Sequence, residues 1–386
     1  MLKRMTFLIF ALALLIGMGV TANALAGDTT GSMVYRWEGM NNLDQSSDMD
    51  DAAGFGQLRS RVSFGGDVNG NASYMFTVEN YQIFGDPAAD ANSIYQATFT
   101  MADFLFEDFD VTIGRMPMSY GRERVVGVDD WQLNRNITFE GCHDRYSFDS
   151  GWLDFFKFKM VETFGGKYDD GVGDTDLMGL YMHYDANEDF FFEPYVMLMT
   201  TENWADPDID NDRMMVFGAL FDYVHEGIHF YGEAVMQSGT SYLPAEMDQS
   251  GLGYYAGLFY NFDSAVNPYI GFEYNFASGD DVTTAEDEDF RALFGSTSEF
   301  LGLMNEVAWC DIVALRFAGG FTPTENLDVS VDFYVFNSAE EVGGQAAIGN
   351  AIDVKVDYML HGDPDPEGGF GPFTADENGG MDVTPA

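Results

Sequence analysis

Sixteen short segments of alternating apolar and polar residues are the feature that most limits how this chain can fold. A period of two places successive side chains on opposite faces of a β-strand. The segments lie at residues 33–40, 56–66, 73–84, 93–102, 109–116, 142–148, 152–161, 176–184, 190–200, 214–224, 228–237, 252–262, 269–276, 314–321, 329–336 and 351–360. The sequence therefore predicts an all-β chain.

The connections between these segments alternate in length along the chain. Short turns, such as Asp149–Gly151 and Glu226–Gly227, are followed by long connections that are acidic and rich in glycine. Outer-membrane barrels sort their connections in this way, with short periplasmic turns and long extracellular loops. We therefore expect a transmembrane antiparallel β-barrel of about 16 strands (16–18), with long acidic extracellular loops.

The alternation within a strand shows which side chains share a face, although it does not show where each face points. On one segment Leu58, Val62 and Phe64 share one face, and Arg59 and Arg61 share the other. In a membrane barrel the apolar set meets lipid and the polar set lines the lumen. In a half-buried soluble sheet the apolar set would face a core instead. The alternation alone leaves both arrangements open, and the sorted connections and the N-terminus favour the membrane barrel.

The N-terminus has the three parts of a secretory signal peptide. Lys3 and Arg4 precede an apolar run from Phe7 to Val20, and Ala24–Ala26 forms a cleavage site. The apolar run is short for a transmembrane anchor. We predict that residues 1–26 are removed on export, that residues 27–360 form the barrel, and that the acidic, Gly- and Pro-rich residues 361–386 are disordered.

The charge of the chain is strongly negative, at −47 from 64 acidic and 17 basic residues. Such a charge excludes nucleic acid as a partner. The acids gather at residues 44–51, 202–212, 280–289 and beyond 363. These segments are either solvated loops or loops bridged by Ca²⁺, which prefers carboxylate oxygens. None has the spacing of an EF-hand, and no other cofactor is indicated.

Two further features of the sequence involve residues that can form disulfides or bind zinc. Cys142 and Cys310 could form a disulfide in an exported chain or remain free thiols. His225–His229 matches H-E-x-x-H, but that zinc motif requires a helix, and here it spans a predicted turn between strands. We find no nucleophile motif beside any histidine and expect no enzymatic activity.

A loop of more than twenty residues after Met116 carries Tyr120–Arg124, and Trp131 follows. Loops of this length between strands are usually functional or disordered, and the arginines and aromatic residues favour function. Phe290–Phe294, followed by Phe300–Met304, forms a second unusual segment. Taken in order, the two segments resemble the signatures of the alginate export family. The resemblance covers roughly residues 36–360 and implies a porin-like channel in the bacterial outer membrane, with the first loop folded inward.

Charged residues on the polar faces of strands, or in the inward loop, are the candidates for lining the pore and binding solutes. They are Arg59, Arg61, Arg122, Arg124, Arg135, Arg145, Lys157, Lys159, Arg316, Glu79, Glu233 and Glu273. They could form either a mixed lumen typical of general porins or a dedicated path for a polyanion. The acidic loops favour the mixed lumen, because they would repel a polyuronate.

The sequence therefore predicts passive diffusion of small polar or charged solutes, with an anionic polysaccharide as a further candidate. The expected surroundings are outer-membrane lipid and lipopolysaccharide. A non-conducting structural or adhesion barrel with cation-binding loops is the alternative. The sequence leaves open whether the barrel is a monomer or a trimer.

Overall fold

The fold is described from a computed structural model of the chain. It describes residues 27–40, 53–130, 132–133, 137–161, 174–202, 211–241, 247–281, 283–295, 300–303, 307–342 and 345–359. The predicted signal peptide and tail lie outside these residues. The chain divides into two compact units, Met1–Met116 and Pro117–Ala386, which are treated separately.

Unit 1 contains five antiparallel strands, each paired with the next along the chain. They are β1 (Gly27–Met40), β2 (Ala53–Asn69), β3 (Ala72–Ile83), β4 (Asp86–Met101) and β5 (Phe109–Met116). The turn between β2 and β3 is tight, because Asn69 already pairs with Ala72.

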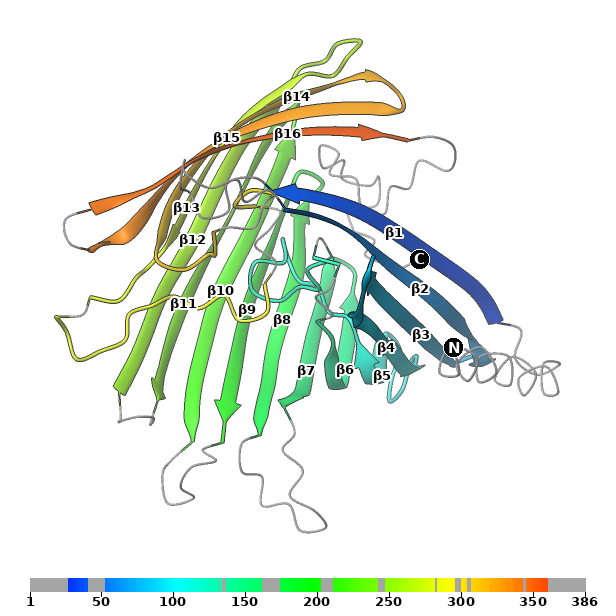
Figure 1. Ribbon diagram of the computed structural model, residues 1–386. Helices are drawn as coiled ribbons and strands as arrows, with labels where there is room; N and C mark the ends of the chain where they lie inside the picture. Colours follow the sequence, from blue (N-terminus) through cyan, green and yellow to red (C-terminus); the bar gives the residue numbers. More distant parts are fainter. Residues whose placement is uncertain are drawn as a thin grey trace. The chain divides into compact units, whose positions relative to one another are not determined.

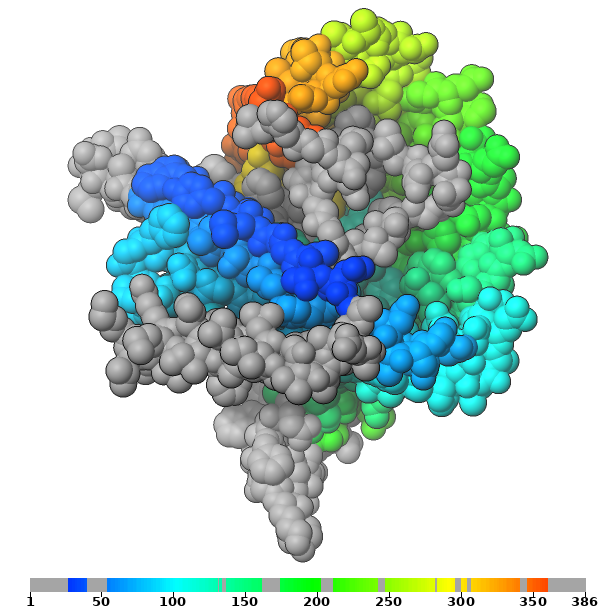
Figure 2. Space-filling model, turned by 90° about the vertical axis from the view of Figure 1, so that its right-hand side faces the viewer, coloured from blue at the N-terminus to red at the C-terminus, as the bar shows by residue number. Residues whose placement is uncertain are grey.

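Unit 2 contains eleven strands that pair antiparallel with their neighbours in chain order (Figure 1). They are β6 (Phe139–Phe148), β7 (Gly151–Val161), β8 (Thr175–Asn187), β9 (Phe190–Thr201), β10 (Asp212–His225), β11 (Ile228–Ser241), β12 (Met247–Asn261), β13 (Tyr269–Ala277), β14 (Ile312–Thr324), β15 (Leu327–Val342) and β16 (Gln345–Tyr358). In the space-filling view these strands follow one another from green to orange (Figure 2).

The sixteen predicted segments each coincide with one of the sixteen described strands, although many strands extend further than predicted. The largest extension is in β4, which begins at Asp86, where polar and small residues hide the alternation. The predicted Glu226–Gly227 turn is confirmed: both residues have positive φ, 46° and 82°. The H-E-x-x-H sequence therefore lies on a β-hairpin. Among the described residues, no helix is long and apolar enough to cross a membrane.

Burial within the strands follows the period of two, and polar side chains occupy the buried face. On β11, His229, Tyr231 and Glu233 are buried, whereas Phe230 and Met236 on the other face are exposed. This arrangement is the reverse of a half-buried soluble sheet. It confirms the inverted alternation that the sequence predicts.

Candidate functional site

The segment after β5 folds into a compact loop, here called the arginine loop (residues 117–130). Its backbone turns through left-handed conformations at Gly121 and Glu123, with φ of 53° and 57°. Glu123 holds the turn together: its carboxylate accepts hydrogen bonds from Ser119 Oγ at 2.6 Å and the Val128 amide at 3.2 Å. Burial raises the pKa of Glu123, and these two hydrogen bonds oppose the shift.

Arg124 ties the arginine loop to the buried face of β13. Its Nη2 lies 2.8 Å from Glu273 Oε1, and both side chains are 0% exposed. The guanidinium also lies over the rings of Phe300 and Tyr255, with Cζ 4.1 and 4.5 Å from their centroids. Glu273 accepts a further hydrogen bond from the Tyr231 hydroxyl. The pair with Glu273 therefore anchors the loop. Because Arg124 is fully buried, a passing solute does not reach it.

Arg122 is buried beside the same group of rings. Its Cζ lies 3.6 Å from the centroid of Tyr231 and 5.8 Å from that of Phe300. Cation–π contacts of this kind are strongest where the charge has lost its water. Burial acts to lower the pKa of Arg122, but the neighbouring Tyr231, Tyr255 and Glu273 outweigh it and raise the pKa. The arginine therefore remains charged.

Tyr120 ties the other end of the turn to β7 and β8. Its hydroxyl donates to Asp154 Oδ2 at 2.8 Å, and its ring stacks on Tyr181 with centroids 4.1 Å apart. Asp154 also accepts bonds from Arg145 Nε and Nη2, at 2.7 and 2.8 Å, and lies 2.7 Å from His143 Nε2. Burial, followed by the Asp154 charge, raises the pKa of Tyr120, which keeps the phenol protonated as a donor.

The second unusual segment lies directly against the first. It is here called the aromatic loop (residues 290–295, 300–303 and 307–309). The Phe294 amide donates to Val125 O at 2.9 Å, and the Gly127 amide donates to Phe294 O at 3.0 Å. A Cβ at Gly295 would lie 1.9 Å from Arg124 O, so glycine is required there. Figure 1 shows both loops, in cyan and yellow, beside the strands of unit 2.

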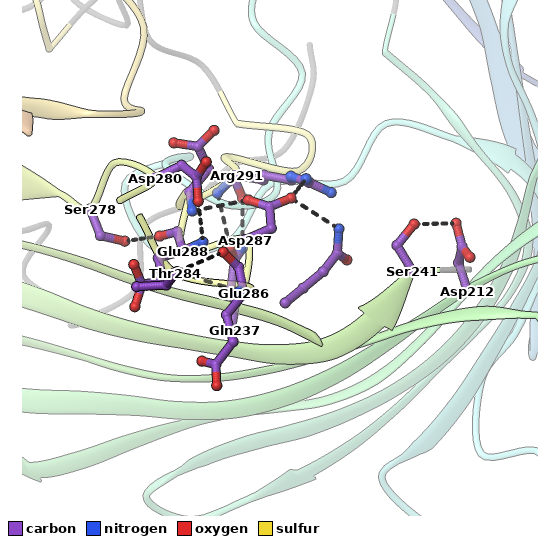
Figure 3. Close-up of polar contacts among 12 residues, drawn as sticks. Asp212, Gln237, Ser241, Ser278, Asp280, Thr284, Glu286, Asp287, Glu288 and Arg291 are labelled. Carbon is purple, nitrogen blue, oxygen red and sulfur yellow. Dashed lines mark hydrogen bonds and ion pairs between the residues drawn. The ribbon is translucent and has the colours of Figure 1, made fainter. Parts of the chain in front are cut away.

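The start of the aromatic loop is held by polar contacts with the neighbouring strands (Figure 3). Gln237 on β11 accepts from the Arg291 amide at 2.9 Å and donates to Arg291 O at 2.6 Å. The Arg291 guanidinium is paired with Asp287, and Ser278 donates to Glu288 O at 2.7 Å. The acidic 280–289 segment is therefore tied into the fold by specific hydrogen bonds.

A row of tyrosine–carboxylate bonds crosses the buried face of unit 2. The hydroxyl of Tyr181 donates to Glu193, and that of Tyr195 donates to Glu233 Oε1 at 2.6 Å. His183 Nδ1 lies 2.7 Å from Glu193 Oε1. Glu233 and Glu273 are on this face as predicted from the sequence, whereas Asp154 and Glu193 were not among the predicted residues. Their parity with buried aromatic residues on the same strands, such as Tyr195, could have identified them.

The buried face of unit 1 has a simpler arrangement of charges. Arg61 Nε donates to Glu79 Oε2 on the next strand at 2.8 Å, and the guanidinium Cζ lies 3.5 Å from the centroid of Tyr95. Ser63 and Thr77 are hydrogen-bonded at 2.8 Å one step further along. Arg59 is buried on the same face. The predicted parity of Arg59, Arg61 and Glu79 is confirmed.

The remaining candidates are scattered. Arg316 forms two 3.1 Å hydrogen bonds with Asp332, and Lys159 pairs with Asp174 at 2.7 Å near the end of β7. Lys157 and Lys159 need correction: both alternate with the buried positions of β7 and lie on the face opposite to that of Asp154. The reason is that Phe156, whose ring stacks on Tyr120, and Phe158, whose ring lies against Phe139, take the buried positions. Arg135 lies outside the described residues.

Across the described part of the chain, no three His, Cys, Asp or Glu side chains are grouped to hold a metal ion. Calcium bridging of the acidic loops stays a prediction. Cys142 and Cys310 are both free thiols in this structure.

Comparison with solved structures shows the fold. The chain is similar to OprB of Pseudomonas putida, at 15% identity and a TM-score of 0.50, over 86% of this chain and 94% of that one. It is also similar to a loop L8 deletion mutant of OmpT, an outer membrane protein of Vibrio cholerae, at 11% identity and a TM-score of 0.51, over 87% and 99%. No match was found among curated proteins.

The family of the chain is shown by its sequence. Residues 32–356 match the alginate export family, which covers most of the chain and nearly all of the strands. The fold is a porin-type transmembrane β-barrel, so the buried charged face is the lumen and the exposed apolar face meets lipid. This protein belongs to the alginate export family of channels in the bacterial outer membrane.

Proposed function

We propose that this protein is a passive channel for small polar solutes that prefers cations, rather than a dedicated path for a polyuronate. The observation that carries the proposal is the pairing of the lumen arginines. Arg61, Arg124, Arg145 and Arg316 each form an ion pair with a carboxylate on the lumen side of the strands.

Pairing changes what an arginine can offer to a solute. A guanidinium that recognises a uronate carboxylate does so through two parallel hydrogen bonds. In Arg145 and Arg316 two such bonds are already made to Asp154 and Asp332. Binding a uronate there would require breaking an internal pair and leaving a carboxylate without its partner, which is unfavourable.

The charge of the whole chain points the same way. With a net charge of −47, the field at the channel mouths is negative, which concentrates cations and repels polyanions. Rings of charged side chains select permeating ions by sign, and the lumen itself supplies no excess of positive charge to reverse this field. We therefore expect a moderate preference for cations.

The two loops set the upper limit on solute size. Both pack on the lumen side of unit 2, with Phe290, Phe300 and Trp309 buried against the wall. Barrels of about sixteen strands are too wide to be filled by wall side chains, so inward loops determine the constriction. The anchoring of the arginine loop at Asp154 and Glu273 makes this constriction a fixed feature.

The test is single-channel recording of the refolded mature protein in a planar bilayer under a KCl gradient. We expect stepwise conductance, a reversal potential of the cation-preferring sign, and no block by short uronate oligomers. A reversal potential of the opposite sign together with concentration-dependent uronate block would overturn the proposal in favour of a polyuronate path. A folded barrel without conductance would favour a structural or adhesion role.

A further inference from the structure

The lipid-facing side of β6 and β7 differs from that of β9 to β13. On β9 to β13 the outward-facing positions between the strand ends are every second residue, counted within 192–198, 215–221, 230–236, 252–258 and 270–276 and beginning with the first residue of each range. Within these described strands they carry no acidic or basic side chain. This is the apolar band that a barrel presents to acyl chains.

On β6 and β7 the same face carries charges. His143 and Arg145 reach Asp154 on the lumen side, so Asp144 between them points to the outside. Lys157 is exposed on the outside of β7, in line with Leu153 and Phe155. Charged groups facing lipid destabilise a barrel most strongly near the middle of the membrane. Their presence indicates that something other than acyl chains covers this face.

Neither charge is neutralised by a described residue of its own chain. The only hydrogen bond to the Asp144 carboxylate among the described residues comes from the Cys142 thiol, at 3.0 Å. Lys157 has no ion pair with any described residue. The two lie diagonally across the strand pair, because Asp144 is opposite Phe155 and Cys142 is opposite Lys157.

We propose that the outer face of β6 and β7 is an interface with a second copy of this chain, in which Asp144 of one copy pairs with Lys157 of the other. The same face also carries Glu140 and Lys159, which are opposite each other in the register. The patch therefore has two acidic and two basic groups and no net charge, so it is complementary to itself. Self-complementary patches are what symmetric homo-oligomers use. Pairing across the interface would also remove both charges from lipid, which offsets the cost of their position.

The proposal rests on the membrane location of the barrel and not on the selectivity proposed above. An asymmetric ligand such as a lipid phosphate would explain Lys157 but not Asp144, which it would repel. The short Asp144 side chain also cannot extend to the headgroups as a lysine can. A second copy satisfies both residues at once.

Cys142 lies between the two charges and provides the probe. The protein in outer membranes is treated with a short bismaleimide, in a Cys310→Ser background, and cross-linked dimers are counted. We expect dimers that disappear in Cys142→Ser, with the mass of the untreated oligomer confirmed in mild detergent by native mass spectrometry. Lys157→Glu should reduce the oligomer at least about tenfold, and Asp144→Lys combined with Lys157→Glu should restore it.

A second variant tests whether loss of the two charges affects folding. Lys157→Met with Asp144→Leu removes both charges and should give a heat-modifiable, folded barrel that is more monomeric than the wild type. A wild-type monomer without cross-links would overturn the proposal, as would an oligomer that Lys157→Glu leaves intact. A monomer that loses bound lipopolysaccharide in Lys157→Glu would assign the face to lipid and also overturn it.

Discussion

The lumen faces of the two units pair their buried charges in different ways. In unit 1 charges are paired across neighbouring strands, as between Arg61 and Glu79, which are directly opposite in the register. In unit 2 the pair of Arg124 and Glu273 joins residues 149 positions apart in the sequence, and one partner comes from a loop. Pairs between strands stabilise a wall that already exists, whereas the loop pair creates a structure inside the lumen.

The difference predicts how each region tolerates the loss of a charge. A pair that remains partly solvated can relax when one partner is removed. A fully buried pair cannot, because the remaining charge has neither water nor a counterion. Substitutions at the buried pair of unit 2 should therefore cost more than those at the pair of unit 1.

Glu273→Ala should have the largest effect on stability. It leaves Arg124 charged and buried, and we expect a loss of about 3–5 kcal/mol in the free energy of unfolding. Reversible urea unfolding in detergent, followed by tryptophan fluorescence, measures it. Replacing both partners, Arg124→Met with Glu273→Leu, is the control and should cost far less. Equal losses for the single and double variants would contradict the account of the buried pair.

Asp154→Asn should come next. The amide keeps the shape of Asp154 but loses the charge that Arg145 and His143 share, and charged hydrogen bonds are worth about 1.5–3 kcal/mol. Tyr120→Phe removes only the loop contact and should cost about 1 kcal/mol. The same unfolding measurement checks both variants. A larger loss of stability for Tyr120→Phe than for Asp154→Asn would contradict the role of Asp154 as the shared partner of Tyr120, Arg145 and His143.

Glu79→Gln in unit 1 should cost about 1 kcal/mol or less, because the amide oxygen can still accept from Arg61. The contact of Arg61 with the Tyr95 ring also remains. If this variant were as damaging as Glu273→Ala, the contrast between the two units would fail.

The smallest effect concerns pH. Burial raises the pKa of Glu123 above its ordinary value of 4.5, so the protonated form is favoured in the folded loop. Its contribution to loop stability is therefore complete below 4.5 and is lost as the pH rises through the raised value. Open-channel current noise should decrease as the pH is lowered from neutral towards 4.5. Glu123→Gln should remove this dependence, and an unchanged pH dependence in that variant would exclude Glu123 as its source.

The strands and their facing were largely predictable from the sequence, because a period of two is a local signal. Arg61 and Glu79 could be assigned to the lumen in this way. Lys157 was assigned wrongly, because Phe156 and Phe158 occupy lumen positions that a simple polar–apolar rule gives to lysine. Phe156 is covered by Tyr120 of the arginine loop, and no local pattern reports a loop packed inside a barrel.

The role of the buried arginines was harder to predict for the same reason. The sequence indicates that Arg122 and Arg124 lie in an inward loop, which fits either solute binding or anchoring. Only the position of Glu273 and Tyr231, far away in the chain, decides between the two. In the sequence, Tyr120–Arg124 and Phe290–Phe294 are two separate motifs. In the structure they lie together, because the Phe294 amide is hydrogen-bonded to the Val125 carbonyl.

Single-channel recording of Arg124→Ala beside the wild type distinguishes an anchoring role of Arg124 from a solute-binding role. If Arg124 anchors the loop, the released loop should give a larger conductance with more current noise, and the sign of the reversal potential should stay that of a cation-preferring channel. An unchanged conductance with a reversal potential shifted further towards cations would show that Arg124 faces the permeating solute, and would contradict the account.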